Sequence, residues 1–331
     1  MRNFFCFSAA YLVVGILLVQ LFRGDAAESV LIALKASAAI LRNSDWRIMG
    51  VFVLALAYVF FSCGRSEWRE LAIRLGFAVV GTIVFLSAFG LIKTLLTDIQ
   101  PFFADRLFAN LDAALHGGVD PWRITHEWAA AIPMSWAGPI YLHVWSALSA
   151  LVPLALAVLD RDEARVRRYL VLYGVAWILL GNALALAGMS AGPVYYDRVL
   201  GADRFAELNA AIDGGALGNP LFRLIQEGLW ELHVDGPKIL GTGISAFPSV
   251  HVAVACVVAL YTAERVRWLT PVAFVFVGAV LFLSVFTGYH YAIDGYVSVL
   301  VVGASWAWLR RGEMRRGEIR EVAAPVAVPA E

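Results

Sequence analysis

Apolar stretches long enough to cross a lipid bilayer recur along the whole of this 331-residue chain. A transmembrane helix needs about 20 mostly apolar residues, and only 16% of the residues here are charged, against about 25% in soluble domains. The sequence therefore predicts an all-α fold, a polytopic membrane helix bundle of about eight transmembrane helices with additional interfacial helices. The expected spans are roughly residues 4–22, 48–63, 71–92, 136–159 and 169–189, with three more between Ser249 and Arg310.

The segments between the expected spans include two that favour interfacial helices. Residues 30–42 are mostly apolar with two charges, which favours a helix lying on the membrane surface or packing beside the bundle. Residues 95–133 carry apolar side chains at helical intervals, so we expect a pair of interfacial helices there that could cover a lipid entrance. Three acids of this segment are expected on solvated helix faces or against an acceptor alcohol and not as metal ligands, namely Asp98, Asp105 and Asp112.

A single integral membrane domain is expected over residues 1–312, with a catalytic core at about 71–309. The remaining residues, 313–331, are charged and then rich in Ala, Pro and Val, a composition typical of disordered chain. We therefore expect a disordered cytoplasmic tail after the last span.

Basic residues near the span ends predict orientation, because short cytoplasmic loops are enriched in Lys and Arg. Four basic connections are placed in the cytoplasm, namely 64–69, 161–168, 265–267 and 310–316. Only the connection after the first span disagrees with this orientation, because it carries four basic residues but falls on the extracytoplasmic side. These residues are Arg23, Lys35, Arg42 and Arg47. The prediction is a protein of the plasma or inner membrane with both termini in the cytoplasm. Lys93, His251 and His290 then all emerge at the extracytoplasmic face, where they can form one site.

Charge and motifs exclude several classes of function. The formal net charge is zero and the sequence has no Gly-rich phosphate loop, so nothing indicates a nucleic-acid partner. The three cysteines, Cys6, Cys63 and Cys256, are scattered along apolar stretches, which argues against a disulfide framework and a zinc cage. We expect no metal and no cofactor, and the sequence leaves the oligomeric state open.

The sequence Pro248-Ser249-Val250-His251 stands at the start of an expected span. Proline is favoured at helix beginnings, and a serine there can cap free backbone N–H groups. These N–H groups and the positive end of the helix dipole attract anions. A histidine in this first turn can donate a proton to a leaving oxygen, so the pattern predicts an anion site beside His251.

His290 and Asp294 stand four residues apart after the next expected span. If a helix begins there, the two side chains share one face, and Asp294 can hold one ring nitrogen of His290. The other nitrogen is then left as a nucleophile. Lys93 follows the expected span 71–92 at the same level of the membrane and can supply positive charge.

Three motifs together resemble those of the type 2 phosphatidic acid phosphatase superfamily. That family carries Lys-x6-Arg-Pro, Pro-Ser-Gly-His and Ser-Arg-x5-His-x3-Asp in this order. Here the motifs read Lys93 with six residues to a Gln-Pro pair, then 248–251, then His290 with three residues to Asp294. They cover the chain from Lys93 to Asp294, and the three together are specific where each alone is weak.

The resemblance implies a role for each matching residue. His290 would attack phosphorus to give a phosphohistidine, with Asp294 as its partner and His251 as the general acid. No metal would be needed. The residues expected to contact phosphoryl oxygens are Lys93, Ser249 and Gln100.

Two arginines of the family motifs are absent from this chain. Gln100 stands in place of one, and Leu283-Ser284 stand where Ser-Arg would be. The sequence Gly288-Tyr289-His290-Tyr291 with Asp294, together with the long outer segments, looks more like the inositol phosphorylceramide synthase and sphingomyelin synthase branch. Enzymes of that branch move a phosphoalcohol head group between lipids. Phosphodiester substrates carry one charge on phosphorus, so fewer cations would suffice than for a phosphomonoester.

The sequence thus predicts a phosphotransferase that moves a phosphoryl or phosphoalcohol head group from a membrane lipid to an alcohol. Phospholipids and polyprenyl or sphingolipid-type molecules are the expected substrates. A lipid phosphatase, with water as the acceptor, shares every catalytic residue and is the first alternative. A non-catalytic scaffold or transporter is the second, but it predicts polar residues mid-span and repeat symmetry, whereas the polar residues here gather at one face.

Overall fold

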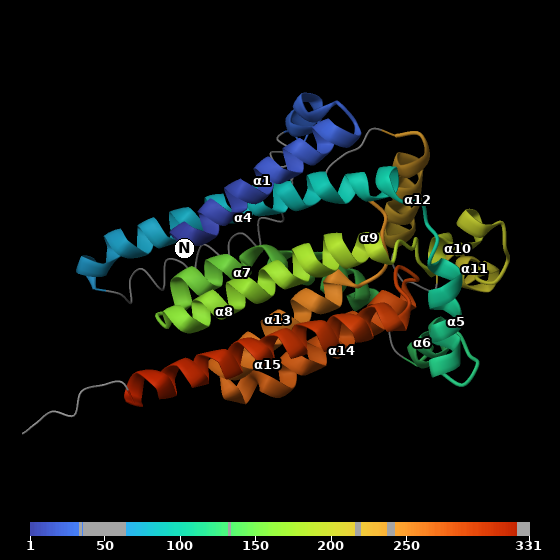
Figure 1. Ribbon diagram of the computed structural model, residues 1–331. Helices are drawn as coiled ribbons and strands as arrows, with labels where there is room; N and C mark the ends of the chain where they lie inside the picture. Colours follow the sequence, from blue (N-terminus) through green and yellow to red (C-terminus); the bar gives the residue numbers. More distant parts are fainter. Residues whose placement is uncertain (33–34, 36–63, 132–133, 216–219, 237–241, 323–331) are drawn as a thin grey trace, which may run out of the picture.

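The computed structural model describes residues 1–32, 35, 64–131, 134–215, 220–236 and 242–322, and these residues form helices and the connections between them. The long helices run alongside one another as a bundle, and several short helices gather at one end of it (Figure 1). No strand occurs in the described part of the chain. The predicted all-α membrane fold is confirmed.

Six helical stretches among the described residues are long and apolar enough to cross a membrane. The chain is therefore an integral membrane protein. The stretches are α1 (Arg2–Phe22), α4 (Trp68–Ile99), the run from η2 (Met134–Trp136) to Leu159, the run Glu163–Ala187, η5 (Arg267–Leu269) with α14 (Thr270–Phe286), and Ala292–Arg315 of α15 (Ala292–Val322).

Two of these stretches contain a wide turn of π-helix, a feature that often marks functional positions. In the first, η3 (Pro139–Val144) is π-helical and continues as α7 (Trp145–Leu159). In the second, η4 (Val175–Leu184) is π-helical and lies between α8 (Glu163–Gly174) and α9 (Ala185–Ala187).

The number of spans differs from the expected eight for two reasons. The predicted span 48–63 lies outside the described residues, as does most of the predicted surface helix 30–42. The predicted sixth span is α13 (Val250–Arg265), which has only 16 residues and is not among the six. It packs against α7, α8, α14 and α15, and most residues of its first half are buried. α13 is thus an inner helix of the bundle.

Five short helices gather at the end of the bundle where α4 ends and α15 begins (Figure 1). The expected pair of helices within 95–133 is confirmed by two of them. The first of these leaves Leu107, Leu111 and Leu115 exposed on one side, as a helix at a membrane surface would. The five helices are α5 (Asp105–Leu115), α6 (Pro121–Ala129), α10 (Pro193–Leu200), α11 (Ala206–Asp213) and α12 (Pro220–Val234).

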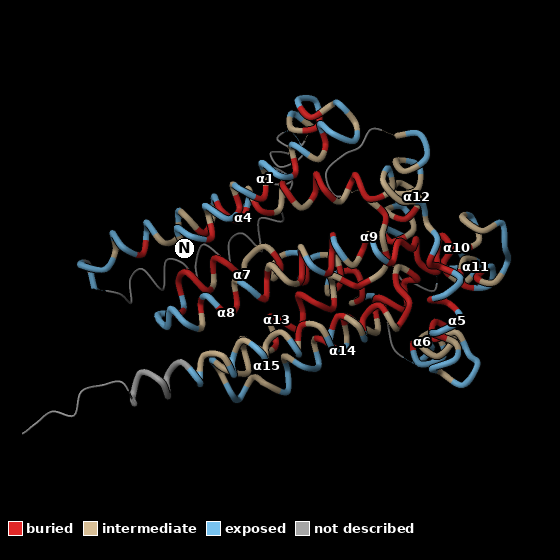
Figure 2. The backbone as a smooth tube through the Cα atoms, in the orientation of Figure 1, coloured by how far each residue is buried: buried red, intermediate tan, exposed pale blue. Residues whose placement is uncertain are grey.

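Buried residues concentrate toward this same end, where the connections before α10, α13 and α15 meet (Figure 2). Along the spans, many large apolar side chains are exposed on the outside of the bundle, among them Leu17, Val275 and Leu300. Apolar exteriors suit helices that face lipid. At the opposite end, α15 continues to Val322, so the segment 313–331 expected to be disordered begins as helix, and residues 323–331 lie outside the description.

Candidate active site

Three connections far apart in the sequence are interlocked at the end of the bundle that carries the short helices. The backbone N–H of Ala246 donates to the carbonyl of Ser190 at 2.8 Å, and that of Val194 donates to Gly288 at 2.9 Å. Gly192 has a φ of +95°, and a Cβ there would stand 2.5 Å from the carbonyl oxygen of Tyr289. Only glycine allows that approach, so the three connections form one framework for the side chains that follow.

His290 and Asp294 form the contact that their spacing predicts. Nδ1 of His290 lies 3.3 Å from Oδ2 of Asp294, and the same oxygen accepts the backbone N–H of Tyr291 at 3.0 Å. Asp294 is completely buried. His290 itself lies before α15, which begins at Ala292, so a tight turn and not a shared helix face brings the two together. Because a carboxylate only accepts, Nδ1 carries the proton and Nε2 is left as a nucleophile.

His251 lies in the first turn of α13, and aromatic rings hold its side chain on both sides. Its ring stacks on Tyr141 with 4.6 Å between centroids and on Trp145 with 3.9 Å. The indole N–H of Trp145 also donates to the backbone carbonyl of His251 at 2.9 Å. The ring centroids of His251 and His290 are 5.9 Å apart. Both stacking residues come from η3 and the residue that follows it, so this π-helical segment fixes the orientation of His251.

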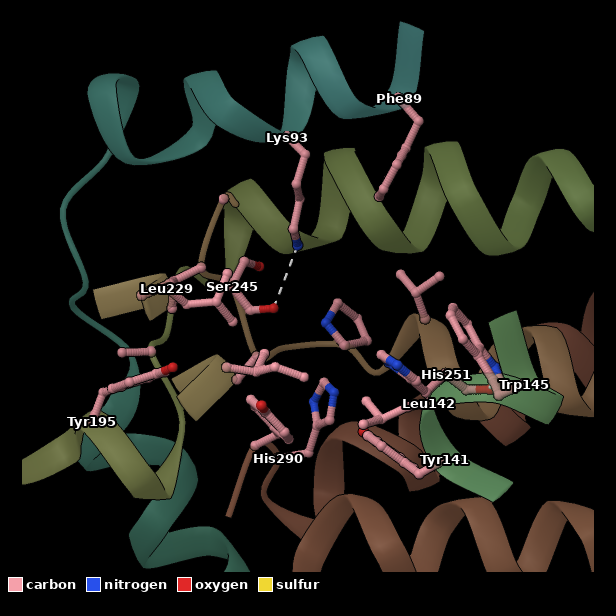
Figure 3. A pocket seen from close by; sticks show the side chains of 18 of the residues that line it. Phe89, Lys93, Tyr141, Leu142, Trp145, Tyr195, Leu229, Ser245, His251 and His290 are labelled. Atoms are coloured by element: carbon pink, nitrogen blue, oxygen red, sulfur yellow. Dashed lines mark hydrogen bonds between the residues drawn. The ribbon is translucent and has the colours of Figure 1, made fainter. Parts of the chain in front are cut away.

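Lys93 reaches the same place from α4. Its Nζ donates to the carbonyl of Ser245 at 3.4 Å (Figure 3). Among the described residues no carboxylate forms an ion pair with it. The connection before α13 passes close to α4 here, since a Cβ on Gly243 would stand 2.4 Å from the carbonyl oxygen of Lys93. An ammonium held in an apolar protein without an anion beside it is suited to bind one.

Lys93, Tyr141, Trp145, His251 and His290 line a cavity of about 380 Å³. Figure 3 shows His251 and His290 with Lys93 above them and Tyr141 and Trp145 beside His251. The cavity is of a size that suits a small ligand or a lipid head group. Apolar side chains supply most of the remaining wall, among them Phe89, Trp177, Ile225 and Leu229.

Ser249 and Gln100 are not brought to this cavity. Ser249 is fully buried and caps α13, its hydroxyl accepting the N–H of Val252 at 3.4 Å. Gln100 stands at the end of α4. Neither is among the described lining residues, and their contacts with phosphate stay predictions. Ser284, at the position of a family arginine, donates to the carbonyl of Val280 at 2.8 Å and brings no charge.

Asp105 and Asp112 were expected on solvated faces or against an acceptor alcohol, and the solvated placement is wrong. Both are buried, with 1% and 2% of their surface exposed, and both accept backbone N–H groups from distant parts of the chain. Loss of hydration on burial raises the pKa of each carboxyl, and the hydrogen bonds oppose that rise. Their seven-residue spacing, with Phe108 and Ala109 between them on one helix face, was the available signal.

A buried His–Asp pair, a second histidine and a lysine around an apolar cavity define a membrane protein equipped for nucleophilic and acid–base chemistry on an anionic group. A family model described as PAP2 superfamily (PAP2_3) matches residues 106–308. The chain belongs to this superfamily. The match covers His251, His290 and Asp294 and begins after Lys93. Membership implies a lipid phosphatase or phosphotransferase type of enzyme, with phosphorylated lipids as the general class of substrate. No curated protein and no solved structure matches the chain.

Proposed function

We propose that this protein is a lipid phosphotransferase that moves a phosphoryl or phosphoalcohol head group to an alcohol acceptor through a phosphohistidine at His290. The observation that carries the proposal is the His290–Asp294 pair at 3.3 Å, set in a cavity whose only described lysine or arginine is Lys93. Within the superfamily, we propose that the chain works as enzymes of the inositol phosphorylceramide synthase type do.

Each catalytic residue has a defined role in the proposed cycle. Asp294 accepts the Nδ1–H of His290, so Nε2 attacks phosphorus and a P–N bond replaces the P–O bond to the leaving group. His251 gives its proton to that leaving oxygen. In the second half the acceptor alcohol passes its proton to His251, and its oxygen attacks phosphorus and breaks the P–N bond. Lys93 holds a non-bridging phosphoryl oxygen throughout.

The charge of the cavity favours a phosphodiester substrate. A phosphodiester has one negative charge and a phosphomonoester up to two, while Lys93 is the only lysine or arginine of the described lining. Neutral donors can complete the contacts. The hydroxyl of Tyr289 is buried without a hydrogen-bond partner, and the residue lines the cavity. A buried unpaired hydroxyl costs about 1–3 kcal/mol, and a bound phosphoryl oxygen would relieve that cost.

The same arrangement supports a proposal for lipid access and for orientation in the membrane. The apolar wall near Phe89 and Leu229 suits an acyl, sphingoid or polyprenyl chain beside the head group. The basic connections expected in the cytoplasm belong to the end of the bundle opposite the short helices (Figure 1), where Arg161 pairs with Glu67 and Arg168 with Glu264. By the positive-inside rule the cavity then opens toward the extracytoplasmic face, and both termini lie in the cytoplasm.

The test uses purified full-length protein in detergent with phospholipid labelled in the phosphate, with and without ceramide, diacylglycerol or inositol as acceptor. We expect label to move to the acceptor with wild type and not with His290→Ala. Release of free phosphate regardless of acceptor would make the protein a phosphatase with the same site. No turnover by wild type with any of these donors and acceptors would overturn the proposal and favour a scaffold or transporter.

A further inference from the structure

α5 places two buried carboxylates against the backbone that follows His290. Asp105 Oδ1 accepts the hydroxyl of Tyr291 at 2.9 Å and the N–H of Gly192 at 2.9 Å. Its Oδ2 accepts the N–H of Ala191 at 2.8 Å. This carboxylate therefore joins the residue next to His290 to the connection before α10.

Asp112, two turns further along the same face of α5, binds the start of α15. Its two oxygens accept the N–H groups of Ala292 at 2.8 Å and Ile293 at 2.9 Å. These are the first backbone donors of α15, which have no partner inside the helix. Asp105 and Asp112 together hold residues 291–293, the three residues that separate His290 from Asp294.

The position of residues 291–293 matters because the His290–Asp294 hydrogen bond is already long. At 3.3 Å it is at the long end for a hydrogen bond and beyond the about 2.7–2.9 Å typical of a charge-assisted one. A shift of a few tenths of an ångström in residues 291–293 would break it, and Nε2 would no longer be fixed as the nucleophilic nitrogen. A displacement of about 1 Å at a reacting group can cost about 100-fold in rate.

We propose that Asp105 and Asp112 are positioning residues, which act through residues 291–293 to fix His290 against Asp294. The inference rests on the proposed role of His290 as the nucleophile. It also assigns α5, expected only as a surface helix, a direct part in the geometry of the site. Burial opposes the ionised form of both carboxyls and raises their pKa, and the backbone hydrogen bonds that they accept favour the ionised form.

The test compares Asp105→Asn and Asp112→Asn with Asp197→Asn in the purified full-length protein. Asparagine turns one acceptor oxygen into a donor, which faces an N–H group at either position. Asp197 is the matched control because it also accepts a backbone N–H, that of Phe205 at 3.1 Å, in the same outer region. Tyr291→Phe removes only the hydroxyl bound to Asp105 and keeps the ring, so it serves if an aspartate variant does not fold.

We expect kcat for transfer from the labelled phospholipid to the acceptor to fall about 10- to 100-fold in Asp105→Asn and Asp112→Asn with KM unchanged. Tyr291→Phe should lower kcat about 3- to 10-fold. Asp197→Asn should change neither constant. Folded aspartate variants or a Tyr291→Phe variant with wild-type kcat would overturn the inference, as would an equal loss in Asp197→Asn.

A second readout needs no substrate, so the inference and the proposed function can fail separately. In protein labelled with ¹⁵N-histidine, the Nδ1–H resonance of His290, assigned by its absence in His290→Ala, should be lost or shifted in Asp105→Asn and kept in Asp197→Asn. An unchanged resonance in Asp105→Asn would overturn the positioning role even if turnover fell. A wild-type enzyme without turnover would overturn the proposed function while leaving this measurement decisive for the inference.

Discussion

The two ends of the bundle differ in whether a buried basic side chain is paired with carboxylates. At the end away from the cavity, Arg168 is 8% exposed at its side chain and pairs with Glu264 at 2.6 Å and with Glu313. Trp306 donates to the same Glu264 at 2.6 Å. A buried charge with several partners is a structural feature, because each group would be costly if left alone.

At the cavity end, Lys93 contacts only the carbonyl of Ser245 among the partners that the structure describes. The difference teaches how to separate structural from ligand-binding charge in a membrane protein. A cation whose partners are already in the protein stabilises the fold, and one that faces a cavity without a partner is reserved for a ligand. Substitutions at the two ends should therefore affect different quantities.

The largest effect is expected at the nucleophile. His290→Ala should lower turnover of the labelled phospholipid by more than about 10⁴-fold, since removing a nucleophile that acts with a partner removes the whole reaction path. Turnover at saturating lipid measures this directly. His143, exposed on η3, provides the control, and His143→Ala should keep wild-type turnover. A His290→Ala variant within tenfold of wild type would show that the site works by another route.

Lys93→Met should lower kcat/KM by about 100- to 1,000-fold, because the charge that stabilises the phosphoryl group is lost. Its thermal stability should not fall, since no carboxylate loses its partner. Lys93→Arg, which keeps the charge, should recover part of the activity. The comparison between the two ends would break if Lys93→Met unfolded the protein at a lower temperature while leaving kcat/KM intact.

Arg168→Met should give the reverse pattern. It leaves Glu264 and Glu313 without their buried partner, which costs about 3–5 kcal/mol in the free energy of unfolding. Thermal unfolding in detergent, monitored together with turnover per folded molecule, separates the two quantities. We expect a lower unfolding temperature and unchanged turnover, and a selective loss of turnover would mean that this end also contributes to the site.

The smallest effect concerns pH at the cavity end. Burial lowers the pKa of His126 on α6, whose Nε2 lies 2.9 Å from the carbonyl oxygen of Phe286. Its folded-state pKa thus lies below the unfolded value of about 6.5. The stability that the neutral ring contributes is complete above that value and is lost as the pH falls through the folded pKa. Unfolding temperatures between pH 7.5 and 5 should show this decline, and His126→Gln should weaken it. A steeper decline in His126→Gln would contradict the assignment.

The part of the site that could be predicted from sequence is the part encoded by short spacing. The four-residue interval from His290 to Asp294 predicts their contact, and basic turns place Lys93 with both histidines at one end. Asp105 could not be predicted to bind residues 191 and 291, because those partners lie 86 and 186 positions away. A polar residue on a short helix looks the same in sequence whether its face meets water or a folded loop.

The helices, like the site, could be predicted only in part from the sequence. Apolar length predicts the spans, but it does not show that α13 lies inside the bundle or that η3 widens into π-helix where Tyr141 and Trp145 stack on His251. Both features arise from packing between segments, which no local pattern encodes. Ser249 shows both outcomes in one residue. Its capping of α13, a local feature, is present as predicted, but its hydroxyl does not line the cavity.

The central claim is a covalent intermediate on His290, and trapping that intermediate tests it most directly. Wild-type protein would be mixed with phospholipid carrying ³²P in the head group, quenched within a turnover and digested. We predict label on the peptide that contains His290, stable in base and lost in acid as a P–N bond requires, and no label in His290→Ala. Turnover by wild type with no label on that peptide, or equal labelling of His290→Ala, would contradict the account.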